Sequence, residues 1–266
     1  MLDRYNREIT YLRISVTDRC NLRCVYCMPE DGIELLEHAD ILSYDEITAF
    51  TRVAAARGVR KVKFTGGEPL VRRGVSRLVS MIASIEGITD ISMTTNGILL
   101  PEYAGELKEA GLQRVNISLD TVNPSRYREL TRIGELEDVL KGIDAAIDAG
   151  LAPVKINCVV RQSSGERDAR EVASYGTGRG LEVRFIQEMT LSSGSYGIVH
   201  GGSGGDCSRC NRLRLTSDGK LKPCLFSDVE ADIIDLGYNR AIDFALEHKP
   251  LCGTINEKGY FYNIGG

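Results

Sequence analysis

Six of the eight cysteines in this 266-residue chain fall into two groups of three. The first group has the spacing C-x3-C-x2-C and consists of Cys20, Cys24 and Cys27. The second has the spacing C-x2-C-x13-C and consists of Cys207, Cys210 and Cys224. Three thiolates can bind a zinc ion together with a water, or hold three irons of a 4Fe–4S cluster and leave the fourth iron open. The spacing alone leaves both chemistries open.

The setting of these cysteines argues against a disulfide framework. The first residues are too charged for a signal peptide, and no run of about 18 apolar residues predicts a membrane span. Without an export signal, clustered cysteines indicate metal ligands in a reducing cytoplasm. Cys158 and Cys252 stand alone, and we expect both to be structural. A net charge of −4 gives no general attraction to nucleic acid.

The elements that must position the cysteines alternate along the chain. Short apolar runs predict strands at 11–16, 59–64, 88–94, 113–119, 153–160 and 181–187. Helical patterns lie between them, near 44–57, 70–85, 101–110, 136–149 and 168–179. Strand–helix alternation predicts a parallel sheet with right-handed crossovers. We therefore predict an α/β fold, an incomplete (β/α)6 TIM-type barrel over residues 1–188, with the first cysteine group in the loop after its first strand.

The pattern changes after residue 188. A Gly/Ser-rich loop comes first, and two short strands follow it around the turn signal Asp218-Gly219. A helical stretch near 237–248 comes next. We predict that residues 189–266 form a small hairpin-and-helix extension over the barrel mouth.

Each predicted strand has one apolar and one polar face. In the first strand, for example, Arg13 alternates with Leu12 and Ile14. An antiparallel sheet with a solvated face would also show this pattern, but the intervening helices would cover such a sheet. We therefore expect the polar faces to line a wet lumen. Because the faces carry several cations and few acids, we expect an anionic ligand; the cations are Arg13, Lys63, Lys155 and Arg184.

The first cysteine motif, in "DRCNLRCVYCMPE" (18–30), resembles the signature of the radical S-adenosylmethionine (SAM) superfamily. Tyr26 fits the aromatic residue before the third cysteine, and "TGGEP" (65–69) resembles the glycine-rich element of that superfamily. The resemblance implies a 4Fe–4S cluster whose open iron chelates the amine and carboxylate of SAM. One electron would then cleave SAM, and the resulting 5′-deoxyadenosyl radical would abstract a substrate hydrogen.

The second motif, "CSRCNRLRLTSDGKLKPCLF" (207–226), resembles the C-terminal signature of the GTP 3′,8-cyclase family, and the likeness extends over nearly the whole chain. It implies a lyase of molybdenum cofactor biosynthesis that converts GTP to (8S)-3′,8-cyclo-7,8-dihydroguanosine 5′-triphosphate. It also implies a second 4Fe–4S cluster, whose open iron contacts the guanine base.

The resemblance assigns roles to individual residues. It implies SAM contacts at Tyr26, Gly66, Gly67, Glu68, Ser118 and Met189. It implies GTP contacts at Arg13, Lys63, Thr94, Lys155, Arg184, Arg212 and Arg214. Lys63 stands where many members have Arg, so it keeps the charge but not the planar fork. The residues with implied catalytic roles are Arg212, Arg214, Gly265 and Gly266, the last two as a glycine tail that reaches into the site.

The resemblance also implies partners. These are a reductant protein such as flavodoxin or ferredoxin, a downstream cyclic pyranopterin synthase, and a second copy of the chain in a homodimer.

One departure from the family leaves two other functions open. Familiar members have a much longer stretch between Met189 and Cys207 than residues 190–206. The chain could therefore be a shortened paralogue that acts on another nucleotide or on a peptide. The non-enzymatic alternative is a zinc-stabilised binding module, with Asp206, His200 or a distant cysteine as fourth ligand. Metal analysis separates these cases, since two 4Fe–4S clusters give about eight irons per chain and the module about two zincs.

Overall fold

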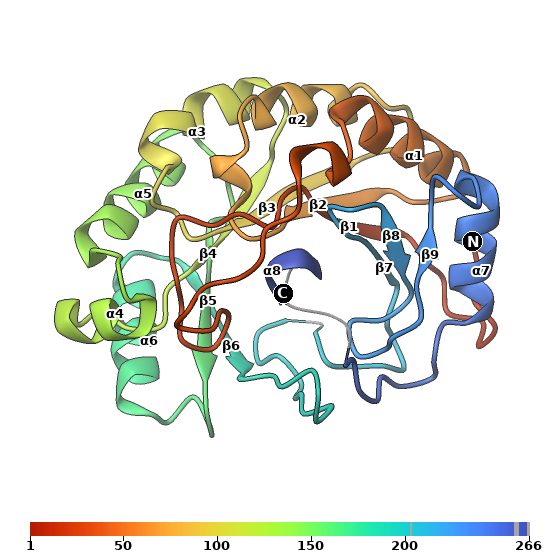
Figure 1. Ribbon diagram of the computed structural model, residues 1–266. Coiled ribbons are helices and arrows are strands. Elements are labelled where there is room, and N and C mark those ends of the chain that lie inside the picture. The colour runs from red at the N-terminus through yellow and green to blue at the C-terminus, as the bar shows by residue number, and fades with distance from the viewer. Residues whose placement is uncertain (203, 258–260, 265–266) are drawn as a thin grey trace.

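The computed structural model describes residues 1–202, 204–257 and 261–264, and a nine-stranded sheet forms its centre (Figure 1). The strand order is β6-β5-β4-β3-β2-β1-β7-β8-β9. The first six strands pair in parallel: β1 (Tyr11–Ser15), β2 (Lys61–Thr65), β3 (Asp90–Thr95), β4 (Arg114–Ser118), β5 (Lys155–Val160) and β6 (Glu182–Gln187). The predicted incomplete six-stranded barrel is confirmed.

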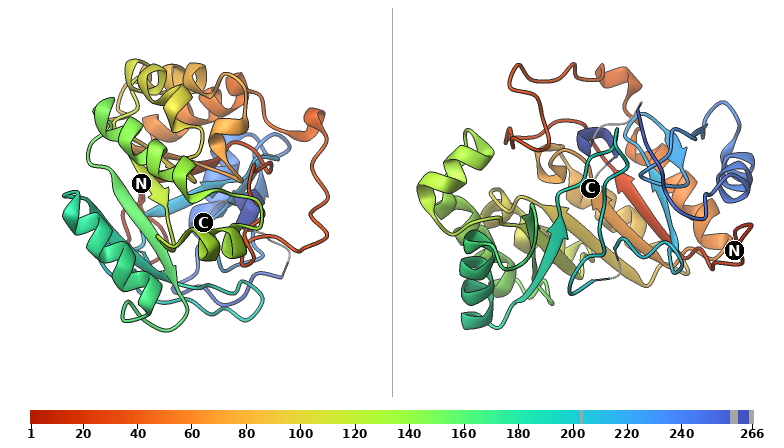
Figure 2. Two further views of the ribbon diagram at one scale, coloured as in Figure 1. Left: turned by 90° about the vertical axis from the view of Figure 1, so that its left-hand side faces the viewer. Right: turned by 90° about the horizontal axis from the view of Figure 1, so that it is seen from below.

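Helices form the outer layer of this curved sheet (Figures 1 and 2). The five predicted helices are α1 (Tyr44–Ala56), α2 (Val75–Ala83), α3 (Leu100–Glu109), α5 (Leu136–Asp148) and α6 (Arg167–Gly178). Within the barrel, three short elements were not predicted: the 3-10 turns η1 (His38–Asp40) and η2 (Pro69–Val71), and α4 (Pro124–Thr131).

Helix α1 shows how the sequence fixes such an element. The Ser43 hydroxyl accepts a hydrogen bond from the Glu46 backbone N–H at 3.2 Å, and the Glu46 carboxylate accepts one from the Ser43 N–H at 2.7 Å. This capping box satisfies N–H groups that have no partner inside the helix. Ile47 and Phe50 then face the sheet and are fully buried, so the helix packs with its apolar side inward.

The predicted hairpin continues the barrel sheet instead of lying apart from it. Strand β7 (Arg212–Leu215) pairs in parallel with β1, and β8 (Lys220–Lys222) and β9 (Ala231–Asp232) follow antiparallel. Pairing with β7 satisfies the backbone groups on the edge of β1 that faces away from β2. Helix α7 (Tyr238–Glu247) matches the predicted helical stretch. Since the sheet and its apolar core run through residue 188, the two-domain division stays a prediction.

The C-terminal part of the chain returns to the open centre of the barrel. Helix α8 (Phe261–Ile264) lies inside the arc of strands (Figure 1). Leu191, Leu225, Phe226 and Ile264 form a second, smaller apolar cluster there. The described part of the chain has no helix with the length and apolar character that a membrane crossing requires.

Candidate active site

A cavity of about 320 Å³ opens at the carboxyl ends of the barrel strands. Its wall contains residues from both cysteine groups: Cys20, Cys24, Cys27, Cys207, Cys210 and Cys224. A volume of this size suits a small-molecule site. The barrel therefore brings two groups that lie about 180 residues apart in the sequence onto one chamber.

The loop that carries the first cysteine group is held by the glycine-rich element after β2. The Gly67 N–H donates to the Thr17 carbonyl, and the Glu68 N–H donates to the Arg19 carbonyl, both at 2.8 Å. A Cβ on Gly67 would lie 2.3 Å from the Arg19 oxygen. Glycine is therefore required here so that two backbone segments can pack together.

Glu68 connects this element to the end of β3. Its carboxylate is 1% exposed and accepts hydrogen bonds from the Thr95 hydroxyl at 2.8 Å and the Asn96 N–H at 2.7 Å. Burial raises the pKa of Glu68 to about 7, although these hydrogen bonds oppose the shift. The Asn96 side chain donates in turn to the Asn21 side chain at 2.7 Å, next to Cys20. Glu68 thus aligns the cysteine loop with β3.

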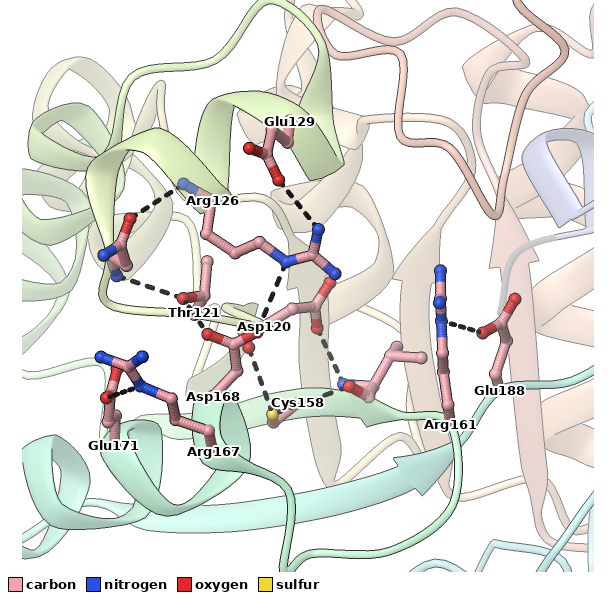
Figure 3. A network of polar contacts seen from close by, with 12 residues as sticks. Asp120, Thr121, Arg126, Glu129, Cys158, Arg161, Arg167, Asp168, Glu171 and Glu188 are labelled. Carbon is pink, nitrogen blue, oxygen red and sulfur yellow. Dashed lines mark hydrogen bonds and ion pairs between the residues drawn. The ribbon is translucent and has the colours of Figure 1, made fainter.

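Tyr26 is anchored from the opposite side of the cavity. Its hydroxyl donates to Asp120 Oδ2 at 2.7 Å, and the Val159 N–H donates to Asp120 Oδ1 at 2.8 Å. Burial raises the pKa of Asp120. In Figure 3, Asp120 lies beside Cys158 in a network that continues to Asp168. Asp120 therefore fixes the ring of Tyr26 over the first cysteine group.

Three arginines from two adjacent strands face the cavity. Arg13 on β1 is the register partner of Arg214 on β7, and Arg212 lies on the same face of β7. Burial, followed by the nearby Arg13 and Arg212, lowers the pKa of Arg214. Like charges gathered in a buried place favour an anionic ligand that balances them.

Three predicted cations do not line the cavity. Lys63 is buried beside Arg13, and burial together with Arg13 and Arg184 holds the pKa of Lys63 well below its usual range. Lys155 and Arg184 both form ion pairs with Glu182, the latter at 2.8 Å. Their predicted contacts with GTP stay predictions, and the pairing with Glu182 already balances part of their charge.

The other predicted site residues lie on the cavity wall where the structure describes them. These are Tyr26, Gly66, Gly67, Glu68, Thr94, Ser118 and Met189. Gly265 and Gly266 lie outside the described residues. Phe261, at the start of α8, lines the cavity, and Ile264 is buried. Phe261 lines the cavity four positions before Gly265 in the sequence.

The thiols of the first group fit a multi-iron cofactor. Burial raises the pKa of Cys20 to about 11 and of Cys27 to about 12, so these sulfurs need nearby positive charge to ionise. Among the described residues, no three His, Cys, Asp or Glu side chains are arranged to hold a single metal ion. A 4Fe–4S cluster is held by thiolates on separate irons, and the three cysteines of the first group, which face one cavity, fit such a cofactor.

Cys252 lies beside the second group but on its outer side. A hydrogen bond to Cys207 raises the pKa of Cys252, and the Tyr196 hydroxyl lies 3.1 Å from Cys207 Sγ. Cys252 is exposed and is not part of the described cavity wall, whereas Tyr196 is part of it. The expected structural role of Cys252 stays a prediction.

Sequence reasoning missed several residues that hold the site together. Arg132 donates to the carbonyls of Arg23 and Met28 at 2.7 and 3.0 Å and so clamps both sides of the cysteine loop. Its φ of +66° places it in a region that non-glycine residues rarely adopt. Asp120 gave a signal, since it ends the "ISLD" segment directly after a strand, but Arg132 gave none.

The comparisons with known proteins agree with this geometry. The model of the radical SAM superfamily matches residues 14–175. A GTP 3′,8-cyclase from Petrotoga mobilis is 40% identical over 313 aligned positions, which cover 98% of this chain and 97% of that protein. Another, from Pelotomaculum thermopropionicum, is 44% identical and covers 88% of this chain and 86% of its own length. This chain belongs to the GTP 3′,8-cyclase family of the radical SAM superfamily.

Solved structures of more distant proteins share the fold. A structure titled native anSMEcpe with bound AdoMet has a TM-score of 0.64, 16% identity, and covers 90% of this chain and 80% of its own. Streptococcus suis SuiB bound to S-adenosylmethionine has a TM-score of 0.62 at 16% identity, covering 92% of this chain and 65% of its own. At such identities the likeness concerns the fold alone.

As a cyclase family member, the chain is short. The alignment with the Petrotoga protein spans 313 positions, whereas this chain has 266 residues, so that relative has residues without counterparts here. Part of the cavity wall is formed by the Gly-rich stretch that follows Met189. Within it His200 forms an antiparallel bridge with Phe185 of β6, and Tyr196, Gly197 and Val199 line the cavity.

Proposed function

We propose that this chain is a radical SAM GTP 3′,8-cyclase that converts GTP to (8S)-3′,8-cyclo-7,8-dihydroguanosine 5′-triphosphate in molybdenum cofactor biosynthesis. One observation carries the proposal: both cysteine groups and three arginines line the same cavity. A nucleotide that binds between the two cysteine groups would have its ribose in the middle of the cavity and one of its ends near each group. The proposal includes two 4Fe–4S clusters, one on each cysteine group.

The first cysteine group and its neighbours would hold SAM. A 4Fe–4S cluster there supplies, when bound, the electron that turns SAM into a hydrogen-abstracting reagent for the ribose 3′ position. Tyr26, fixed by Asp120, would position the adenine end, and the backbone at Gly66 and Gly67 would meet the methionine end. Apolar neighbours such as Leu22 and Met189 exclude water from this part of the cavity.

The arginines would hold GTP. Arg13 and Arg214 are register partners on adjacent strands, so their guanidinium groups can converge on one triphosphate. Arg212 lies toward Cys210 and lowers the pKa of that thiol, so it would lie between the ribose and the second cysteine group. These three arginines make the cavity favourable for an anion, although the chain as a whole carries a charge of −4.

The test is a product assay on the reconstituted protein. The full chain is loaded with iron and sulfide without oxygen and incubated with SAM, dithionite and GTP deuterated at C3′. We expect the 3′,8-cyclo nucleotide by mass spectrometry and one deuterium in the 5′-deoxyadenosine. Formation of 5′-deoxyadenosine without deuterium and at a rate independent of GTP would overturn the proposal. ATP and ITP serve as parallel substrates, and a preference for either identifies a shortened paralogue.

A pair of cysteine variants controls this assay. Cys224→Ala removes a cavity-facing thiol of the second group, whereas Cys252→Ala removes an exposed one beside it. We expect Cys224→Ala to lose about half of the bound iron and all cyclic product, because each 4Fe–4S cluster holds four irons. Cys252→Ala should keep both. Bound zinc in place of iron would favour the binding-module alternative.

The partners implied by the family resemblance belong to the same proposal. They are a flavodoxin or ferredoxin as electron donor, a cyclic pyranopterin synthase that takes the product, and a homodimer, all in the cytoplasm. No nucleic-acid or membrane partner is proposed.

A further inference from the structure

A buried lysine lies behind the second cysteine group and is not used by the proposed reaction. Lys249 follows α7 and is 1% exposed. Its ammonium donates to the Arg212 carbonyl at 2.8 Å and to the Pro223 carbonyl at 2.5 Å. Arg212 comes two residues after Cys210, and Pro223 directly precedes Cys224. Lys249 therefore ties together the two chain segments that carry these cysteines.

The third N–H of the Lys249 ammonium contacts a cysteine sulfur. Lys249 hydrogen-bonds the Cys210 thiol and also lies within electrostatic range of Cys224. An ammonium has three N–H donors, so two carbonyls and one sulfur use all of them. Lys249 and Arg212 are therefore the cations that lie nearest to Cys210.

The charge of Lys249 has no carboxylate counterpart among the described ion pairs. Arg7, which also lies near, donates to the Cys207 carbonyl at 2.7 Å but is already paired with Asp3 at 2.7 Å. Lys222, in the β7–β8 hairpin and also buried, is paired with Glu230 at 2.8 Å. A buried charge needs an opposite charge. For Lys249, Cys210 and Cys224 are the groups that supply the opposing charge.

The first cysteine group has the opposite surroundings. Glu68 lies near Cys20, and Asp120 lies near Cys24. Reduction adds an electron to a cluster, so nearby cations favour the reduced state and nearby carboxylates disfavour it. The two groups therefore differ in electrostatic environment although both consist of three cysteines.

We propose that Lys249 is a positioning residue of the second cluster, which holds its cysteine segments together and raises its reduction potential. This rests on the proposed function, since it requires a 4Fe–4S cluster on each group. Lys249 touches neither substrate nor SAM in this proposal and acts only through the cluster ligands and their backbone.

The test measures the second cluster by itself. The full chain with Cys20→Ala, Cys24→Ala and Cys27→Ala is loaded with iron and sulfide, and the potential is followed by EPR and absorbance during a redox titration. Adding Lys249→Met should shift the ratio of reduced to oxidised cluster about tenfold toward oxidised, which is about 59 mV for one electron. Lys249→Arg should restore most of the potential, because it keeps the charge.

Lys222→Met is the matched control, because it removes one buried positive charge from the β7–β8 hairpin that Lys249 contacts, where Glu230 balances it. We expect a smaller shift from it. An unchanged potential in Lys249→Met, or an equal shift in Lys222→Met, would overturn the role of Lys249 and leave the second cluster intact. If Lys249→Met holds no iron, the arginine variant decides: a native potential supports the proposal, and a lowered one contradicts it. Failure of the triple variant with native Lys249 to bind iron would instead contradict the proposed second cluster.

Discussion

At the scale of single residues, the site depends on how buried polar groups are satisfied. Glu68 and Lys249 are buried and Asp120 is half-buried, and each of them hydrogen-bonds a loop that carries cysteines or the strand next to that loop. A buried group that loses its partner costs more than the hydrogen bond itself contributes. These residues therefore hold the cysteine loops in one arrangement before any cofactor binds.

Tyr26→Phe tests this for the first loop. The change removes the hydroxyl that donates to Asp120 and leaves a half-buried carboxylate with one partner fewer. We expect the free energy of unfolding, measured by urea titration, to fall by about 1 to 3 kcal/mol, and SAM binding to weaken. Tyr44→Phe removes an exposed hydroxyl that donates to the Arg73 carbonyl and should cost below about 0.5 kcal/mol. Equal losses in both variants would show that the Asp120 contact carries no special weight.

Cys252→Ser tests whether a cluster on the second cysteine group keeps one iron without a cysteine ligand. The side chain is exposed and lies next to Cys207, but the cavity wall contains Cys207 and not Cys252. We therefore expect an unchanged iron content and an unchanged EPR spectrum after reconstitution. A loss of about four irons per chain would instead identify Cys252 as a fourth ligand, and guanine could not then bind an open iron there.

At the scale of elements, periodicity predicted which strand faces line the lumen but not which neighbours they meet. The alternation placed Arg13, Lys63 and Arg184 on the polar faces, but of these three only Arg13 lines the described cavity, and Lys63 is buried beside it. The partner of Lys155 is Glu182, directly across from it on β6. This cross-strand pairing depends on how neighbouring strands align, and the residue pattern within a single strand does not predict it.

Helix α4 shows another limit. It begins at Pro124, with Asn123 as its N-cap, and spans eight residues. The Asn-Pro pair reads equally well as a turn, and so short a helix gives little periodicity. Missing it also meant missing Arg132, which follows its last residue and clamps the first cysteine loop. The cysteine motif was recognisable from spacing, whereas its support comes from residues about a hundred positions away.

The loop that replaces the longer family segment is tested by Gly205→Ala. Gly205 has a φ of +81°, and a Cβ there would lie 2.1 Å from the Gly197 carbonyl oxygen. We expect the loop over β6 to open and the Kd for GTP to rise by about tenfold, which corresponds to about 1.4 kcal/mol. Equilibrium binding of GTP to the reconstituted protein measures this. Gly202→Ala is the control, since its Cβ would meet side chains alone, the nearest at 3.1 Å. Unchanged binding in Gly205→Ala would show that this loop does not contact the nucleotide.

At the scale of the whole molecule, the sheet is open and the rest of the chain fills the opening. The first 187 residues give six parallel strands, and β7 to β9 extend the sheet beyond β1. Pairing of β7 with β1 brings Arg212 and Arg214 next to Arg13, although about 200 residues separate them in the sequence. Motif spacing predicted both cysteine groups, but only the tertiary fold places them on one cavity.

The C-terminal part of the chain that fills this opening also places α8 near the cavity, where Asn263 holds the helix in place. The fully buried Ser217 hydroxyl donates to the Asn263 side chain at 2.8 Å, and Asn263 donates to Asp218 at 3.4 Å. Asn263→Ala leaves the Ser217 hydroxyl buried without this partner, so we expect a loss of about 1 to 3 kcal/mol in the local opening free energy. Hydrogen exchange of the backbone around α8 measures that loss.

A looser α8 should also change the outcome of the reaction. Phe261 lines the cavity, so its displacement would leave the substrate less well shielded during hydrogen abstraction. We expect Asn263→Ala to form more 5′-deoxyadenosine per molecule of cyclic nucleotide, while Asn239→Ala, an exposed residue of α7, keeps the native ratio. Both products are measured in one assay by mass spectrometry. Faster exchange at α8 with an unaltered product ratio would mean that the end of the chain stabilises the barrel and takes no part in enclosing the substrate.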